Sequence, residues 1–285
     1  MIPKLIHQTA PTDKNTWHPL WHKCQTSWLS NFKDFEYRMW NDEEIDDLVK
    51  NDYPQHWDMY NEFTIHILKI DFVRFCFMHK FGGIYADMDY FCYKNFYNDL
   101  TENIYVVENP FGNDPIENSL MCSEPNHPFW IECMELVAER YYYLKSKFPQ
   151  RLKDLEFISL DVKQGLKIRP WLVFSITGTN LISSQCRLTK QKIYTLPSVF
   201  FNNNDMSYHE NFKAKHIHTG LWGKESIALF YYDENNRKTL RNVPIEDFCF
   251  YTDYSNGRYL TKSYNDFDKN NADDKITLDS SYQYK

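Results

Sequence analysis

Two adjacent glycines, Gly82 and Gly83, stand directly before residues 84–89 (Ile-Tyr-Ala-Asp-Met-Asp) and constrain the fold more than any other feature. Glycine adopts turn conformations that residues with a β-carbon resist, so a tight turn is expected here. The following residues alternate as a β-strand requires, which puts Asp87 and Asp89 on one face. Two neighbouring carboxylates repel each other unless a cation or a proton lies between them. This segment therefore indicates a divalent metal site at a strand end.

The composition predicts one globular catalytic domain. A chain of 285 residues can bury a sizeable core, and its 18% aromatic residues supply packing material. The net charge of −7, without a long basic stripe, argues against nucleic acid as a partner. The chain contains no apolar run long enough for an integral membrane segment and no signal peptide pattern. We expect the domain over residues 1–262, with an exposed insertion at 145–170 and a flexible polar tail at 263–285.

The cysteines and the residue usage bear on where the chain works. Seven cysteines occur without a C-x-x-C pair, so isolated thiols of a reducing compartment are expected rather than disulfides or a zinc site. The usage of Asn, Lys, Tyr, Phe and Ile is typical of an AT-rich genome. We expect a cytoplasmic location, in a bacterium or in the host of a large DNA virus. The sequence predicts no oligomeric state.

Strand and helix patterns alternate along the chain, which predicts an α/β fold. Residues 2–9 indicate a strand, 17–30 a helix with inward-facing tryptophans, and 35–40 a second strand, so βαβ packing is expected. Asn41 followed by three acidic residues is a good helix start. Later elements are expected as strands at 104–108, from Asn118, at 193–196 and at 199–201, with a helix extending to about residue 144.

A long helical pattern over residues 60–80 leads directly into the two glycines. Its apolar positions recur at spacings of three or four and would form one buried stripe: Ile65, Leu68, Phe72, Phe75 and His79. Asp71 and Arg74 share a face beside that stripe. A structural salt bridge is one interpretation of this pair. The other is that the pair lies close to the Asp-Met-Asp carboxylates and holds a ligand whose phosphates bind the metal.

Three further polar groups are candidate site residues. His7 and Gln8 end the first strand, where ligands of α/β sheets gather, although ordinary strand-end residues fit the pattern as well. Residues 177–180 form a candidate N-cap region in which glycine lets the backbone approach a ligand, or else a plain turn. His216 and His218 alternate onto one strand face, as a metal ligand pair or as a solvated pair.

The ordered motifs together resemble one known family. They are Ile2-Pro3-Lys4-x-Ile6-His7-Gln8-Thr9, Asp71-x-x-Arg74, Gly82-Gly83-Ile84-Tyr85-x-Asp87-x-Asp89, Asn118, Thr177-Gly178 and the segment 216–222. This set is similar to the DXD-containing sugar-transfer family, which includes yeast initiating mannosyltransferases and bacterial capsular and lipooligosaccharide glycosyltransferases. The glucosyltransferase domains of large clostridial toxins share the central motif. The resemblance covers residues 2–222, and D-x-x-R followed by G-G-I-Y-x-D-x-D is its specific part.

The resemblance implies a GT-A fold, which is a Rossmann-like nucleotide-binding α/β sheet with the D-x-D at its edge and a helical accessory region. It also implies a retaining hexosyltransferase that uses Mn²⁺ or Mg²⁺. The donor would be a nucleoside diphosphate sugar, with a UDP-sugar favoured and GDP-mannose as the alternative, and the acceptor a glycan or protein hydroxyl. A cation is suited to this chemistry because negative charge accumulates on the diphosphate leaving group.

The resemblance also assigns roles to residues. The catalytic set is Asp71, Arg74, Asp87 and Asp89, of which Asp87 and Asp89 would hold the metal, while His216 or Trp222 would close over the diphosphate. Strand alternation adds His216 and His218 as metal ligand candidates. The donor-binding set is His7, Gln8, Thr9, Tyr85, Asn118, Gly178 and Trp222. Ala10 stands where the family often has a tryptophan, so Trp17 is the candidate for stacking on the base. Leu221 stands where the family has a serine before Trp222.

Two other functions compete with sugar transfer. A phosphatase of the haloacid dehalogenase type also uses D-x-D after an apolar strand, but Phe91 stands where a small Thr or Val normally follows. An inactive sugar-binding module would be expected to have lost the acids at positions 71, 87 and 89, which are intact here. For the retaining step, the sequence leaves front-face attack and a transient enzyme adduct both open.

Overall fold

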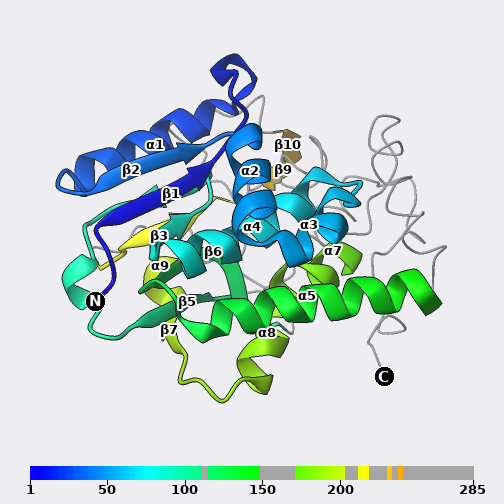
Figure 1. The fold of residues 1–285 in the computed structure, drawn as a ribbon. Helices are drawn as coiled ribbons and strands as arrows, with labels where there is room; N and C mark the ends of the chain where they lie inside the picture. Colours follow the sequence, from blue (N-terminus) through cyan, green and yellow to red (C-terminus); the bar gives the residue numbers. More distant parts are fainter. Residues whose placement is uncertain (111–113, 148–170, 203–210, 218–229, 233–236, 240–285) are drawn as a thin grey trace.

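The structure is a computed structural model, which describes residues 1–110, 114–147, 171–202, 211–217, 230–232 and 237–239 (Figure 1). Its elements follow one another as β1 (Leu5–Thr9), the 3-10 helix η1 (Lys14–Thr16), α1 (Pro19–Asn31), β2 (Glu36–Trp40), α2 (Asp42–Asp52), α3 (Pro54–Asn61), α4 (His66–Lys80), β3 (Gly83–Ala86), β4 (Tyr90–Cys92), η2 (Tyr97–Asp99), β5 (Ile104–Glu108), β6 (Ile116–Ser123), α5 (Pro128–Lys147), α7 (Trp171–Ile176), α8 (Thr179–Leu188), β7 (Tyr194–Leu196), α9 (Ser198–Phe201), β8 (Ala214–His216), β9 (Phe230–Tyr232) and β10 (Arg237–Thr239).

The central sheet has six strands in the order β2-β1-β3-β6-β5-β7. β1 is parallel to β2 and β3, and β5 is parallel to β7, whereas β6 runs antiparallel to both of its neighbours. The predicted α/β class and the βαβ packing are therefore confirmed. Because β1 and β3 are parallel neighbours, their carboxyl ends at Thr9 and Ala86 meet at one edge, where ligands of such sheets bind.

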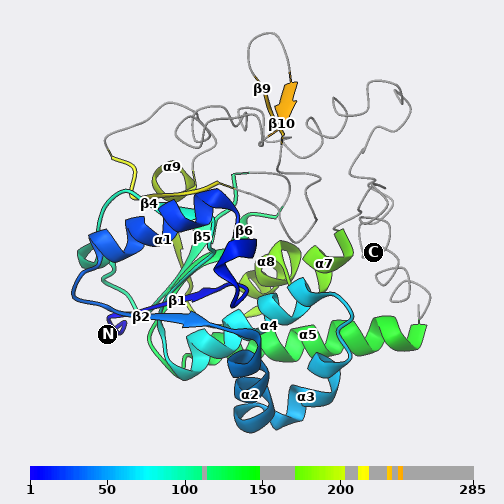
Figure 2. The same ribbon diagram turned by 90° about the horizontal axis from the view of Figure 1, so that it is seen from above.

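Helices cover both faces of this sheet. α4, α5 and α8 pack on one face, with α2 and α3 beyond them, and α1 lies on the other face with β4 (Figure 2). β3 divides its side chains between the two resulting cores, since Tyr85 belongs to the first, and Ile84 and Ala86 to the second. The D-x-D at the sheet edge and the helical layer confirm the GT-A arrangement that the resemblance implies.

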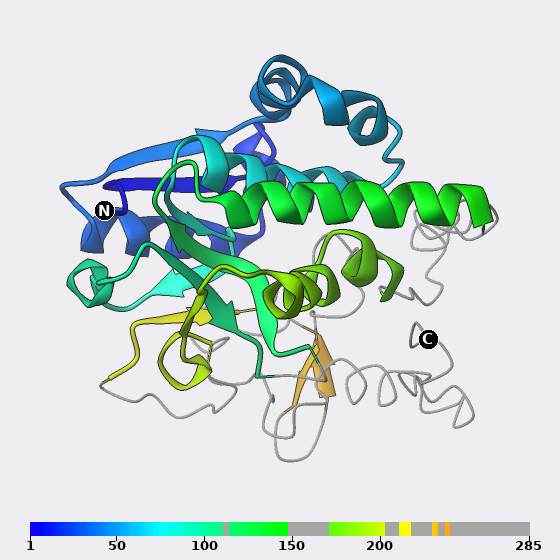
Figure 3. The same cartoon turned by 60° about the horizontal axis from the view of Figure 1, so that its bottom comes forward.

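The helix predicted over residues 60–80 is broken, because α3 ends at Asn61 and α4 begins at His66. α4 is buried from Ile67 to Met78, and only Lys69 in this range is half-exposed. The helix is therefore buried on nearly all sides, whereas the sequence predicted a single buried stripe. The reason is its position: β3 and β6 pack on one side of α4, while α5 and α7 pack against it from elsewhere (Figure 3).

The predicted glycine turn is present, and both glycines have positive φ angles, +63° at Gly82 and +88° at Gly83. A β-carbon at position 83 would lie 2.4 Å from the Leu5 carbonyl oxygen, so glycine is needed for space as well as for conformation. The strand that follows is shorter than predicted, since it ends at Ala86. Asp87 to Asp89 form a turn that the Tyr90 N–H closes by donating to the Asp87 carbonyl oxygen at 2.9 Å.

The other sequence predictions have mixed outcomes. The Asn41 helix start is confirmed as a capping box with Glu44. The strand predicted at 199–201 is wrong: α9 occupies this segment, because the Phe200 and Phe201 N–H groups donate to the Pro197 carbonyl oxygen. Six of the cysteines are free thiols, and Cys249 lies outside the described residues. Residues 148–170 of the predicted insertion and the whole predicted tail also lie outside them.

No helix in the described part of the chain combines the length and the apolar character that crossing a bilayer requires.

We expect Gly83→Ala to lower the free energy of unfolding by at least about 2 kcal/mol, because it adds strain at a positive φ and a clash with β1. Urea denaturation measures this loss. Gln55→Ala, on the exposed face of α3, is the control and should change stability by less than about 0.5 kcal/mol. Equal stability of the two variants would contradict the account of this turn.

Candidate functional site

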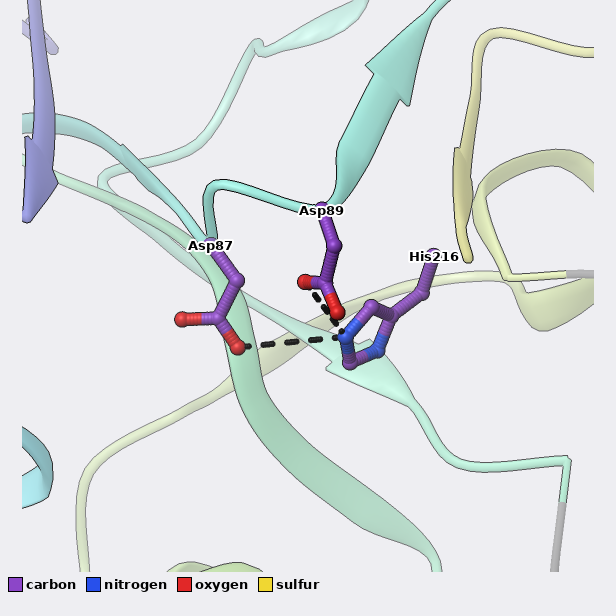
Figure 4. Close-up of side chains that lie close together, drawn as sticks. All are labelled: Asp87, Asp89 and His216. Carbon is purple, nitrogen blue, oxygen red and sulfur yellow. Dashed lines mark hydrogen bonds and ion pairs between the residues drawn. The ribbon is translucent and has the colours of Figure 1, made fainter. Parts of the chain in front are cut away.

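Asp87, Asp89 and His216 converge at the carboxyl edge of the sheet (Figure 4). Nε2 of His216 lies 3.1 Å from Oδ1 of Asp89 and 3.9 Å from Oδ2 of Asp87. One ligand atom from each residue lies within 4.8 Å of the other two. Two carboxylate oxygens and one imidazole nitrogen at this spacing are a donor set for a divalent cation.

Backbone pairing places these residues although they are far apart in the sequence. β4 and β8 are antiparallel, with Tyr90 opposite His216, and the Ile217 N–H donates to the Asp89 carbonyl oxygen at 2.9 Å. The Tyr90 ring stacks on the His216 ring with centroids 5.1 Å apart. The predicted placement of both aspartates on one strand face is corrected: they converge because the chain turns between β3 and β4.

Arg74 connects α4 with the metal candidates, which are the side chains of Asp87, Asp89 and His216. Its Nη1 lies 3.0 Å from Oδ1 of Asp71, and its Nη2 lies 2.8 Å from Oδ1 of Asp87. Nη1 also donates to the Asn118 carbonyl oxygen at 3.2 Å. The sequence suggested either a salt bridge between Asp71 and Arg74 or a position of this pair beside the Asp-Met-Asp carboxylates. The structure shows the salt bridge and also the contact with Asp87.

Asp71 is buried, and both oxygens of its carboxylate accept hydrogen bonds from other side chains of the protein. The Asn118 side-chain amide donates to Oδ1 at 3.0 Å, and the Thr177 hydroxyl donates to Oδ2 at 3.0 Å. Gly178 follows, and a β-carbon there would lie 3.0 Å from the Phe174 Cα and 3.5 Å from Asp71 Oδ2. The α7–α8 junction and β6 are therefore tied to α4 through one aspartate.

Burial shapes the electrostatics of this cluster. It raises the pKa of Asp87 to about 6, although Arg74 acts to lower it. It also raises the pKa of Asp71 against the opposing effects of Arg74, Thr177 and Asn118. Burial alone would lower the pKa of His216, but Asp89 and Glu117 outweigh it and raise this pKa to about 10.

Acidic groups outnumber cationic ones in the contacts described for this cluster. Asp71, Asp87, Asp89 and Glu117 are acidic, while Arg74 and a protonated His216 are the cations that contact them. The contacts described here thus leave an excess of negative charge, which a divalent ion would neutralise.

Side chains of β1 and β3 hold the turn of residues 87–89 in place. The Gln8 amide donates to the carbonyl oxygens of Ala86, at 3.3 Å, and Asp87, at 3.1 Å. Tyr85 donates its hydroxyl to Asp87 Oδ1 at 2.7 Å, and the Thr9 side chain acts against the burial that raises the pKa of Tyr85. These residues, which the sequence predicts to bind the donor, thus hold Asp87 and the backbone around it.

His7 is fully buried, and both of its ring nitrogens have partners. Nε2 lies 2.9 Å from the Gly82 carbonyl oxygen, and Nδ1 accepts from the Trp40 indole at 3.0 Å. Burial lowers the pKa of His7 to about 4, so the ring is neutral and donates to Gly82 through Nε2. His7 thus fixes the glycine turn. Trp17 is buried beside the loop after β1, and its indole donates to the Pro11 carbonyl oxygen at 2.7 Å.

Two predicted site residues, His218 and Trp222, lie outside the described residues, as does Leu221. The sequence reasoning missed Glu117, which is buried and lies 3.3 Å from His216 Nδ1 through its Oε2. The signal that could have found it is the polar run Glu117-Asn118-Ser119 inside an otherwise apolar strand.

The register of β6 explains why this run reaches the site. Val106 pairs with Met121, but the next residue, Val107, pairs with Glu117, so the intervening part of β6 bulges out of the ladder against β5. There the Ser119 carbonyl oxygen accepts from the Asp87 N–H at 2.9 Å. The consecutive side chains of Glu117, Asn118 and Ser119 therefore all contact residues of the site. In a regular strand, every second side chain would point to the opposite face of the sheet.

Comparison with known proteins bears on this site. Residues 19–107 match the family described as "Glycosyltransferase sugar-binding region containing DXD motif". Two yeast proteins are among the relatives. Mannosyl phosphorylinositol ceramide synthase of Saccharomyces cerevisiae is 27% identical over 50% of this chain and 37% of its own length. Inositol phosphoceramide mannosyltransferase 3 of Schizosaccharomyces pombe is 33% identical over 46% of this chain and 36% of its own length. The matched part thus spans little more than a third of either relative.

An uncharacterized glycosyltransferase of Acanthamoeba polyphaga mimivirus is 30% identical over 45% of this chain and 52% of its own length. Among solved structures, the PaToxG glycosyltransferase aligns over 66% of this chain and 69% of its own, with 13% identity and a TM-score of 0.46. At a TM-score below 0.5, that likeness does not bear on the activity. The family match, which includes Asp71, Arg74 and the Asp87-Met88-Asp89 turn, confirms the resemblance seen in the motifs: residues 19–107 are similar to the sugar-binding region of the DXD-containing glycosyltransferases.

Proposed function

We propose that the chain transfers a hexose-type sugar from a nucleoside diphosphate sugar to a hydroxyl group of a glycan or another acceptor, with a divalent ion and with retention of configuration. The observation that carries the proposal is the convergence of Asp87, Asp89 and His216 beside the buried Arg74, at the carboxyl edge of the sheet. The match of residues 19–107, which include Asp87 and Asp89, to a glycosyltransferase sugar-binding region supports the proposal.

The residues present fit a divalent ion. Arg74 and Tyr85 both bind Oδ1 of Asp87, so Oδ2 is the oxygen that faces His216. Carboxylate oxygens suit Mg²⁺ and Mn²⁺, and an imidazole ligand favours Mn²⁺ of the two. When bound, the ion would stabilise the negative charge that develops on the diphosphate leaving group.

We assign to Arg74 the binding of the nucleotide-sugar donor. Its Nε is buried and has no hydrogen-bond partner in the described structure, while both terminal nitrogens hold carboxylates. A guanidinium N–H in that state is a donor group for an oxygen of the sugar or phosphate. Asp71 keeps the guanidinium in place, and Asn118, Thr177 and Gly178 border the same position.

The remaining assignments support this centre. Gln8, Thr9 and Tyr85 hold the turn that carries Asp87, and His7 holds the glycine turn before it. His218 as a metal ligand and Trp222 as a donor contact are carried over from the motif alone. Retention also rests on the resemblance, and proton NMR of the product's anomeric centre tests it. A cytoplasmic location stays a prediction from the sequence.

The donor is proposed as a UDP-sugar or GDP-mannose. The names of the fungal relatives, which refer to mannose transfer, make GDP-mannose the first alternative to test. The phosphatase interpretation is disfavoured, because Arg74 and Tyr85 both engage Asp87, which would have to be the nucleophile.

We expect the purified chain to hydrolyse its nucleotide sugar slowly in the presence of Mn²⁺, and EDTA to stop the reaction. Asp87→Asn and Asp89→Asn should each lower the rate by roughly 100-fold or more, because each removes a charged ligand of the ion. Release of the nucleotide measures the rate. Asp34→Asn, which breaks only a surface pair with Lys4, is the matched control. Turnover without metal, unchanged in both site variants, would refute the proposal.

Thr177→Val removes the hydroxyl that binds Asp71 Oδ2 and keeps a similar volume. We expect kcat to fall roughly tenfold, because Asp71 then holds Arg74 less firmly. The affinity for Mn²⁺ should change by less than about threefold, because Tyr85 still binds Asp87 Oδ1 and Asp71 is not among the metal candidates. Ser184→Ala is the control, because it removes a hydroxyl that donates to the Asn180 carbonyl oxygen and accepts from Arg187, neither of which is a candidate site residue. Equal loss of Mn²⁺ affinity and of kcat would show that this division of roles is wrong.

A further inference from the structure

Glu117 is a buried carboxylate, 5% exposed, on the central strand β6. Burying a carboxylate costs free energy unless charged or hydrogen-bonding partners compensate for it. Two partners are the Ser119 hydroxyl, which donates to Oε2 at 2.8 Å, and Nδ1 of His216, which lies 3.3 Å from the same oxygen. The bulge of β6 brings the Glu117 side chain next to His216. A buried carboxylate in contact with a candidate metal ligand can influence how that ligand binds.

The His216 ring presents its two nitrogens to different groups. Nε2 faces Asp89 at 3.1 Å and Asp87 at 3.9 Å, whereas Nδ1 faces Glu117. Glu117 therefore lies on the other side of the ring from the aspartates, and it is not part of the cluster whose ligand atoms lie within 4.8 Å of one another.

This arrangement decides which nitrogen can bind a metal ion. A carboxylate accepts the proton of Nδ1–H, so that proton stays on Nδ1, and an ion that binds the ring takes the place of the proton on Nε2. Pairing with a carboxylate also fixes the ring orientation and makes the coordinating nitrogen more basic. The stacked Tyr90 ring restrains the plane of the imidazole, but stacking alone does not distinguish its two nitrogens.

We propose that Glu117 is a positioning residue, which holds the His216 imidazole with Nδ1 protonated and Nε2 directed at the ion between Asp87 and Asp89. Ser119 acts one step further out, because its hydroxyl orients the Glu117 carboxylate. The inference rests on the proposed function in that it needs a divalent ion at this site.

Mn²⁺ binding to the full chain tests it without turnover. Titration of free Mn²⁺ by electron paramagnetic resonance gives the affinity, and the ¹⁴N coupling in electron spin-echo spectra reports the imidazole ligand. Glu117→Ala should weaken binding by roughly 10- to 100-fold and reduce the ¹⁴N coupling. Glu117→Gln keeps an oxygen that can accept from Nδ1 but loses the charge that makes Nε2 more basic, so it should still weaken binding by roughly threefold to tenfold. Glu132→Gln, which changes a carboxylate bound to Gln185, is the control.

The outcomes separate the two proposals. Wild-type affinity and ¹⁴N coupling in Glu117→Ala, with the fold verified by circular dichroism, would overturn the role of Glu117. If that variant does not fold, wild-type values in Glu117→Gln would overturn it. A wild-type chain that binds Mn²⁺ through its aspartates without ¹⁴N coupling would also refute this inference, but metal-dependent hydrolysis would then leave the proposed function standing.

Discussion

The buried ion pairs of Arg74 with Asp71 and Asp87 are the interactions on which the rest of the site depends. Removing one member of such a group leaves an uncompensated buried charge, which typically costs about 3–5 kcal/mol. Arg74 belongs to α4, and Asp87 belongs to the turn after β3. Asp71 also receives hydrogen bonds from Asn118 on β6 and from Thr177 at the α7–α8 junction. A single guanidinium thus ties together elements that the sequence keeps far apart.

The same pairs determine how the metal candidates are presented. Because Arg74 and Tyr85 occupy Oδ1 of Asp87, its other oxygen is directed toward Asp89 and His216. The site then combines rigid backbone pairing between β4 and β8 with an excess of acidic groups. Rigid support and converging acidic groups are what a preorganised cation site needs. The residues that match the family's sugar-binding region include α4 and the β3–β4 turn, so sequence similarity and geometry agree.

Local sequence signals predicted much of this arrangement, and long-range packing explains what they missed. Gly82 and Gly83 predict their turn because glycine adopts positive φ angles far more readily than residues with a β-carbon. The all-round burial of α4 was missed, since it depends on the sheet and on α5 rather than on periodicity. Glu117 was missed because strand alternation assumes a regular ladder, and only the partner strand β5 reveals the bulge. The approach of His216 to Asp89 likewise depends on the pairing of β4 with β8.

The central claim is that Arg74 holds one oxygen of Asp87 and thereby leaves the other to a divalent ion shared with Asp89 and His216. A crystal structure of the full chain soaked with Mn²⁺, with anomalous data collected at the manganese edge, tests it most directly. The account predicts one anomalous peak within coordination distance of all three side chains, with Arg74 still bridging Asp71 and Asp87. A peak elsewhere, or Arg74 released from Asp87 when the ion is bound, would contradict it.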